Sequence, residues 1–364
     1  MNGGERERTV AETLAEFTRL CALDFAWLAS SAGERLELVR RGAPEIRAGI
    51  LESGRASCVR TCDLALLPYP TSFAFGGAAT SPLPFIAMTN RMLVVELVTR
   101  DGGLRRLLFN PTDVERSAET PFFARIQARF GARVAARVKR LTRRPTPLEH
   151  LAALGLSPAD VDYVAFDHLH TQDLRRILGT SGEAGWFPRA KLLVHAAELD
   201  ILRRLHPLQE AWFVRDAILG VARDRIAVLG HGDWLLGRGV ALVRTPGHTV
   251  GNMSLVVNTT SGAWVVSENG VACDNYAPRA SKIPGLARHA RTWDVDVVLN
   301  SNTLEGRNEQ YTSMILEREL ADRSAKNPDF YQHFSSSELT RTPLTPGLAP
   351  TFAHGKIESG DFTR

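Results

Sequence analysis

Two histidines and their acidic neighbours form the first group in this sequence that could do chemistry. His168 and His170 stand one residue apart directly after an apolar run, residues 161–166, with Asp167 before them and Asp173 three residues after. The run predicts a strand, and alternate residues of an extended segment can point to the same side. A lone histidine is usually a packed core or surface residue, whereas two at this spacing with flanking carboxylates are typical of metal sites. The pair therefore predicts a metal site at a strand end.

A second histidine segment strengthens this interpretation. Residues 243–257 read VRTPGHTVGNMSLVV. The apolar start predicts a strand that runs into Pro246 and Gly247, and these two residues predict a tight turn that presents His248 at the strand end. His248 is therefore a third candidate ligand.

With these two segments the sequence resembles the metallo-β-lactamase fold superfamily. There, an HxHxDH loop, a TPGHTxG loop, a strand ending in a bridging aspartate and a final strand ending in histidine surround one or two metal ions. The order and spacing match over about residues 56–320, and TPGHTVG is the most specific part of the match. His168, His170 and His248 stand at three of the superfamily's histidines. The other motif positions are altered: Gln172 stands at the aspartate of the first loop, Asp173 at its last histidine, Glu268 at the bridging aspartate and Asn302 at the final histidine.

The altered positions imply two unequal metal sites. The first keeps three histidines and Glu268, which suit zinc or iron with an open position for water. The second keeps only oxygen-type ligands from Asp173, Glu268, Gln172 and Asn302, so it is weak, empty or filled by a harder ion such as Mn²⁺, Mg²⁺ or Ca²⁺. The resemblance also implies that Asp173 acts as general base, because the amide of Gln172 cannot accept a proton. Tyr276 could donate a hydrogen bond to a developing oxyanion, although packing is the simpler role for it.

The pattern of elements divides the chain into three parts. Residues 1–55 predict a helical N-terminal extension, with one helix over about residues 10–30. Residues 56–320 match the superfamily, and the resemblance implies an α/β fold, a four-layer αββα sandwich of metallo-β-lactamase type. Residues 321–364 are rich in serine, threonine, proline and glycine and predict a partly extended or disordered arm. In a homo-oligomer this arm could wrap a neighbour.

A basic helical insertion is predicted at about residues 115–145. Arg125, Arg129, Arg133 and Arg137 step by four residues along it. A solvated helix face is the simpler interpretation, and the alternatives are a rim that attracts an anionic substrate and a contact with a membrane surface.

Composition narrows the location and the partners. The net charge of +4 is too small to indicate a nucleic-acid-binding protein without a concentrated patch. The charged amino terminus and the broken apolar runs lead us to expect a cytoplasmic protein with no secretory signal and no membrane span.

The resemblance and the candidate ligands together predict a metal-dependent, lactonase-like hydrolase. In it, a metal-activated water would attack an ester, a lactone or a related small substrate. Two alternatives stay open. A mononuclear iron oxygenase would need only the first metal position, as in the persulfide dioxygenases of the superfamily. A pseudoenzyme would keep the fold as a binding or assembly module after losing the ligands of the second position.

Overall fold

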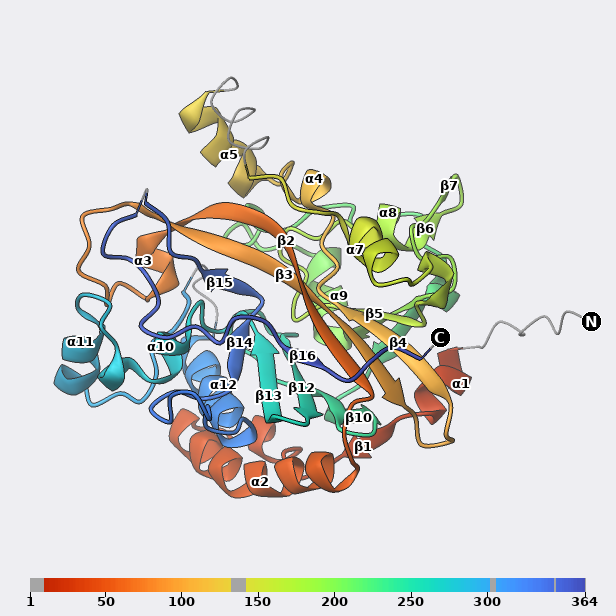
Figure 1. Cartoon of the computed structure of the whole chain (residues 1–364), viewed down its shortest axis with the longest axis horizontal. Coiled ribbons are helices and arrows are strands. Elements are labelled where there is room, and N and C mark those ends of the chain that lie inside the picture. The colour runs from red at the N-terminus through yellow and green to blue at the C-terminus, as the bar shows by residue number, and fades with distance from the viewer. Residues whose placement is uncertain (1–9, 132–141, 302–305, 344, 364) are drawn as a thin grey trace, which may run out of the picture.

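Two stacked β-sheets form the centre of the molecule (Figure 1). The computed structural model describes residues 10–131, 142–301, 306–343 and 345–363. Within these residues, the first sheet has the strand order β1-β10-β11-β12-β13-β14 and is antiparallel except for the pair β13 and β14. Its strands are β1 (Thr18–Leu20), β10 (Asp233–Gly237), β11 (Val240–Arg244), β12 (Met253–Thr259), β13 (Gly262–Ser267) and β14 (His333–Ser335).

The second sheet is mixed, with the order β16-β2-β3-β4-β5-β8-β9 and β15 paired to β3. Strands β4, β5, β8 and β9 run parallel, and the other pairs are antiparallel. Its strands are β2 (Cys58–Pro70), β3 (Phe85–Val98), β4 (Leu104–Phe109), β5 (Tyr163–Ala165), β8 (Lys191–His195), β9 (Ile226–Leu229), β15 (Ser337–Leu339) and β16 (Glu358–Ser359). A separate hairpin joins β6 (Gly179–Thr180) to β7 (Glu183–Ala184).

Strand β3 shows how side-chain alternation builds the layers. Leu93, Val95 and Leu97 pack into the core between the two sheets. Met92 and Val94, which point to the opposite face, pack into the core beneath the outer helices. All five side chains are buried, which explains why residues 92–95 read as a continuous apolar run rather than as an alternating one.

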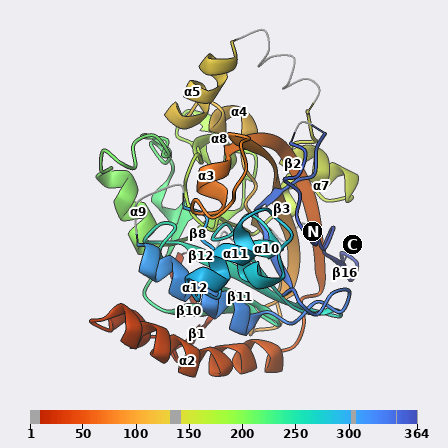
Figure 2. The same ribbon diagram turned by 90° about the vertical axis from the view of Figure 1, so that its left-hand side faces the viewer.

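Helices cover the outer faces of both sheets (Figures 1 and 2). On the first sheet lie α2 (Ala32–Glu52) and α12 (Arg307–Leu320), and on the second lie α3 (Thr71–Ala74), α7 (Pro147–Ala153), α8 (Arg175–Leu178) and α9 (Ala196–Arg203). The remaining short elements are α1 (Val10–Ala15), α4 (Val114–Ser117), α5 (Pro121–Phe130), α10 (Cys273–Tyr276), α11 (Leu286–Thr292) and the 3₁₀ turns η1 (Ala26–Leu28), η2 (Pro158–Asp160), η3 (Arg223–Arg225) and η4 (Pro278–Ala280). The predicted four-layer αββα sandwich is confirmed.

The N-terminal segment joins the sandwich more closely than its sequence pattern predicts. The single helix predicted over residues 10–30 is wrong, because α1 ends at Ala15 and β1 then pairs with β10 as an edge strand of the first sheet. Edge pairing supplies the backbone hydrogen bonds that a helix would otherwise make, so tertiary contact overrides the helical spacing. Helix α2 begins after Ser31, whose hydroxyl accepts the N–H of Glu34 at 3.1 Å.

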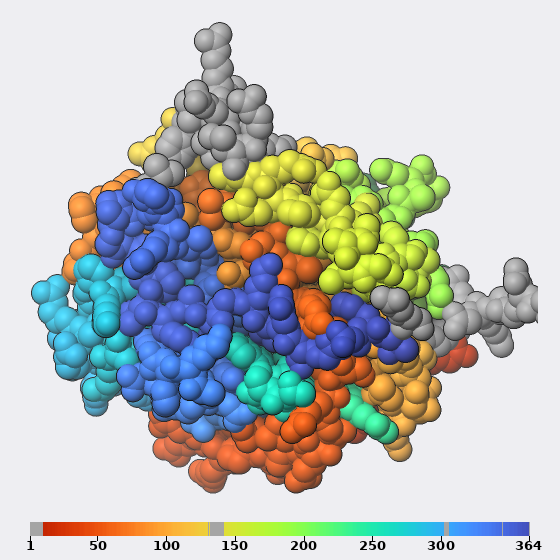
Figure 3. All heavy atoms as spheres, in the orientation of Figure 1, coloured from red at the N-terminus to blue at the C-terminus, as the bar shows by residue number. Residues whose placement is uncertain are grey.

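The C-terminal arm is extended and paired with both sheets. Strand β14 extends the first sheet, whereas β15 and β16 pair with strands of the second. Figure 3 shows the arm in dark blue, lying across one face of the molecule. The arm therefore ties the two sheets together.

The basic insertion is described only in part. Helix α5 projects from the body of the molecule (Figure 1), with Arg125 and Arg129 exposed and Ile126 buried. Arg133 and Arg137 lie outside the described residues. Every helix in the described ranges is too short or too polar to cross a bilayer.

Strand β10 begins with a buried carboxylate, Asp233. Its Oδ1 accepts the backbone N–H of Arg244 at 2.7 Å, and burial raises its pKa to about 7. An aspartate in an unfolded chain has a pKa of about 3.9. The folded protein thus holds a proton that the unfolded chain loses above about pH 4. The stability that this proton contributes to the folded state is fully present below about pH 4, and it is lost as the pH rises through about 7.

Replacing Asp233 with asparagine should therefore stabilise the protein more at pH 8 than at pH 5. The difference in unfolding free energy between variant and wild type should grow by about 2–3 kcal/mol over this range, as urea titrations at the two pH values would measure. Asp200→Asn, at an exposed position of α9, is the control and should show no such growth. A difference that does not change with pH would mean that Asp233 has the same charge in both conditions.

Candidate metal centre

Two loops, one from each sheet, carry the histidines. His168 and His170 follow β5 of the second sheet, and His248 follows β11 of the first. The N–H of Met253, at the start of β12, donates to the carbonyl of Asp167 at 2.8 Å. This bond joins the two loops where the sheets meet.

Close packing explains the glycine of the TPGH turn. Gly247 has a φ of +131°, and a Cβ atom there would lie 2.1 Å from the backbone nitrogen of Gln310 in α12. The hydroxyl of Ser313, also in α12, donates to the carbonyl of Pro246 at 2.7 Å. The turn thus rests directly on the helix, and only glycine meets both the space and the backbone angle.

The structure brings His168, His170 and His248 together. One ring nitrogen from each lies within 4.8 Å of the others, and all three residues are at most 5% exposed. Neither ring nitrogen of His170 has a hydrogen-bond partner among the described residues. Buried polar atoms without a partner are rare in folded proteins, so this histidine group fits a bound metal ion.

A carboxylate orients the first ring. Asp167 accepts a hydrogen bond from Nδ1 of His168 at 2.8 Å, which leaves Nε2 available to a metal. Asn110 and Ser336 hold the other Asp167 oxygen at 3.1 and 2.7 Å. Ser336 belongs to the C-terminal arm, so the arm supports the ligand loop.

Burial affects the protonation of the three rings in different ways. Burial and the neighbouring His168 hold the pKa of His170 well below its usual value and lower the pKa of His248 to about 3. Burial also acts to lower the pKa of His168, but the Asp167 carboxylate outweighs it and raises that pKa to about 9. His170 and His248 are therefore neutral at physiological pH, which is the form of imidazole that binds metals.

Glu268 lies beside one of the three histidines, His168. It follows β13 directly, its Oε2 lies 3.9 Å from Nε2 of His168, and burial raises its pKa to about 7. Its side chain is 17% exposed, more than any of the three histidine residues. Glu268 is therefore less deeply buried than the three histidines. Asn302, the other ligand predicted from this part of the motif, lies outside the described residues.

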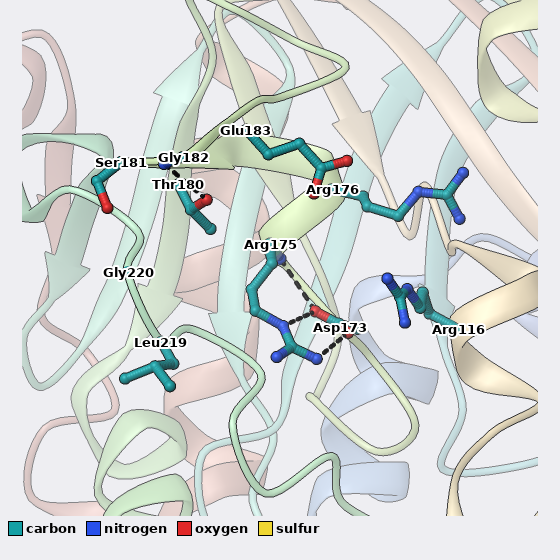
Figure 4. A pocket seen from close by; sticks show the side chains of 10 residues that line it. All are labelled: Arg116, Asp173, Arg175, Arg176, Thr180, Ser181, Gly182, Glu183, Leu219 and Gly220. Carbon is teal, nitrogen blue, oxygen red and sulfur yellow. Dashed lines mark hydrogen bonds and ion pairs between the residues drawn. The ribbon is translucent and has the colours of Figure 1, made fainter.

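The carboxylate of Asp173 faces the guanidinium group of Arg175 (Figure 4). Its carboxylate accepts three hydrogen bonds from Arg175: from the backbone N–H at 3.1 Å, from Nε at 2.9 Å and from Nη2 at 2.6 Å. Among the described residues, the groups able to hold a metal do not include Asp173. Gln172 donates to the hydroxyl of Thr112 at 3.2 Å, and its buried Oε1 has no partner among the described residues.

The hydroxyl of Tyr276 is engaged by a buried carboxylate. Its hydroxyl donates to Oε2 of Glu317 in α12 at 2.7 Å, and its ring stacks on His333 with centroids 3.6 Å apart. A donor held by a buried carboxylate is not free to stabilise an oxyanion. The observed role of Tyr276 is packing against His333, together with the hydrogen bond to α12.

Sequence reasoning missed several residues that support the site. Ser336 and Ser337 lie in a stretch that reads as an arm, so nothing in the sequence marks them, yet they contact Asp167 and Glu268. Glu198 lies in the segment VHAAELD, which predicts only a helix start.

A charged cavity of about 380 Å³ lies beside Asp173 (Figure 4). Its walls carry both signs of charge, because each arginine has a carboxylate partner: Arg116 with Glu119, Arg175 with Asp173 and Arg176 with Asp113. This compensation gives no clear preference for an anion, so an anionic substrate remains a hypothesis.

The two layers of strands bring together histidine loops that lie far apart in the sequence. The chain has a four-layer αββα sandwich that carries both histidine loops at strand ends. No family model matches the chain.

Solved structures with similar folds include hydrolases. A quorum-quenching N-acyl homoserine lactone lactonase is 17% identical, covers 66% of this chain and 88% of its own, and has a TM-score of 0.43. AidC, a dizinc quorum-quenching lactonase, is 13% identical, with coverages of 84% and 95% and a TM-score of 0.48. A probable metal-dependent hydrolase from Staphylococcus aureus is 12% identical, with coverages of 73% and 84% and a TM-score of 0.47. Likeness at these identities says nothing about substrate, which must be argued from the residues of this chain.

Proposed function

We propose that this protein is a metal-dependent hydrolase with one catalytic metal ion held by His168, His170 and His248, and with Glu268 as a further ligand. The observation that supports this most directly is the buried convergence of three imidazoles within 4.8 Å from two different sheets. Three nitrogen ligands are typical of catalytic zinc sites, in which water takes the fourth position, and they are also suited to iron.

The chemistry follows from the donor set and its surroundings. A zinc or iron ion bound there would act as a Lewis acid and lower the pKa of a bound water toward neutrality. Asp167 fixes the ring of His168 with Nε2 turned to the site. Phe213 packs edge-on against His170, with centroids 4.7 Å apart, and excludes water from that side. We propose an ester or a lactone as the substrate class. Attack of an activated water on the carbonyl carbon breaks the ester bond without a further cofactor.

The state of Asp173 supports a single metal position. Both of its carboxylate oxygens accept hydrogen bonds from Arg175, which supplies the positive charge that a second cation would otherwise provide. Because Arg175 engages both carboxylate oxygens, neither is free to take a proton from a water at the site, so we do not assign the role of general base to Asp173.

Replacing Asp173 with asparagine should therefore leave the metal content at one ion per chain. Elemental analysis of the purified variant and of wild-type protein measures this directly. Arg175→Lys, which keeps the charge but loses the two-pronged hydrogen bonding, is a suitable companion and should also retain one ion. A wild-type content of two ions that falls to one in Asp173→Asn would identify a second site and refute the single-metal proposal.

A mononuclear iron oxygenase is the second candidate, and the same observation favours it. Only one position among the described residues gathers three imidazoles, and such an oxygenase needs one position. Iron as the bound metal, together with oxygen consumption on addition of a thiol or persulfide substrate, would select this function over hydrolysis.

The deciding experiment combines metal analysis with activity. Protein purified without added metal or affinity-tag nickel is analysed for zinc, iron and manganese, and then assayed on a panel of esters and lactones and in an oxygen electrode. One zinc ion per chain with hydrolysis supports the proposal. Absence of metal after incubation with all three ions, with no turnover, would contradict it and favour a pseudoenzyme.

A further inference from the structure

Glu198 lies between the two histidine loops. It is the third residue of α9, which begins directly after β8, and it is only 1% exposed. The ring of His195 caps this helix by accepting the N–H of Ala197 at 3.1 Å, so the first turn is held in place. A buried carboxylate in a fixed helical turn must be stabilised by nearby donors.

Its two oxygens contact both ligand loops. Oε1 accepts the backbone N–H of Leu169 at 2.8 Å, and Leu169 stands between the ligands His168 and His170. Oε2 accepts the hydroxyl of Thr249 at 2.7 Å, and Thr249 directly follows His248. One carboxylate thus links ligands that come from different sheets.

Close packing limits movement at this link. A Cβ atom at Gly251 would lie 2.4 Å from the backbone nitrogen of Glu198 and 2.6 Å from its Cβ. The TPGHTVG loop therefore rests on the first turn of α9 through its second glycine, just as it rests on α12 through Gly247. A shift of either loop would therefore break or lengthen a hydrogen bond to the Glu198 carboxylate.

We propose that Glu198 is a positioning residue that sets the spacing between the His168–His170 loop and His248, and thereby the affinity of the centre for its metal ion. The two oxygens of the carboxylate accept one hydrogen bond from each loop, whereas an amide has only one acceptor oxygen, so the carboxylate holds both loops more firmly than an amide would. The inference rests on the proposed function, because it concerns the same metal centre.

The test measures metal affinity rather than turnover. Wild type and variants are titrated with Co²⁺ in competition with a chromophoric chelator, and the visible absorption of bound Co²⁺ reports the ligand geometry. Glu198→Ala should weaken binding by about 10- to 100-fold, as loss of groups behind metal ligands commonly does. Glu198→Gln, whose amide oxygen can still accept the N–H of Leu169, should lose less Co²⁺ affinity than Glu198→Ala.

Two further variants separate positioning from general stability. Thr249→Val removes one hydrogen bond while keeping the side-chain shape, and it should weaken binding less than Glu198→Ala does. Combined with Glu198→Gln, it should show non-additive losses, because both changes act on one link. Asp200→Ala, on the exposed side of the same helix, should bind Co²⁺ like wild type. If Glu198→Ala does not fold, the Glu198→Gln and Thr249→Val pair decides the question.

The possible failures are distinguishable. Wild-type protein that binds no Co²⁺ overturns the proposed function and this inference together. Wild-type binding with unchanged affinity and spectrum in folded Glu198→Ala, or in both Glu198→Gln and Thr249→Val, overturns this inference alone.

Discussion

Replacing His248 with alanine should abolish retention of the metal ion. His248 is the ligand that the first sheet contributes to the histidine group, and its loss leaves His168 and His170, which come from one loop. Loss of groups behind a ligand commonly weakens metal affinity about 10- to 100-fold, so loss of the ligand itself should cost more than about 100-fold. Chelator competition with Zn²⁺ measures the affinity, and the rate of ester or lactone hydrolysis should fall with it.

The control for this change is a histidine outside the group. His206→Ala, at an exposed position, should retain the metal ion and the activity. Retained metal with unchanged hydrolysis in His248→Ala would mean that the catalytic ion lies elsewhere in the chain. Retained metal with lost hydrolysis would instead place His248 in catalysis and not in metal binding.

Replacing Gly247 with alanine should destabilise the protein strongly. The new Cβ would lie 2.1 Å from the nitrogen and 2.4 Å from the Cα of Gln310, and the residue would have to keep a φ of +131°. Strain of this kind costs about 1–3 kcal/mol, and overpacking costs about 1–3 kcal/mol more. We therefore expect a loss of about 2–6 kcal/mol in unfolding free energy, measured by urea titration.

A second glycine gives the matched control. Gly33 lies near the start of α2 with a clear 4 Å around the position of a Cβ. Gly33→Ala should stabilise the protein by up to about 1 kcal/mol, because alanine loses less backbone entropy in a helix. Equal stability of Gly247→Ala and wild type would show that the TPGH turn can separate from α12.

Much of the architecture could be predicted from local patterns. Apolar runs such as residues 161–166 and 240–243 indicate strands, and the Pro246-Gly247 pair indicates a tight turn. The helix predicted over residues 10–30 failed, because pairing of β1 with β10 depends on a strand more than 200 residues away. Local spacing contains no information about such a partner.

From the sequence, periodicity indicated the strands, and the two histidine loops supplied three candidate ligands through residues next to one another in the chain. The four-layer sandwich and the candidate ligands Glu268 and Asn302 came from the resemblance to a known superfamily. Only the tertiary structure decided how the polar side chains pair. Asp173 accepts hydrogen bonds from Arg175, and Tyr276 donates one to Glu317. Glu198 accepts one hydrogen bond from each histidine loop. The physical reason is that a buried polar group must find a partner, and which partner lies within reach depends on how distant segments pack.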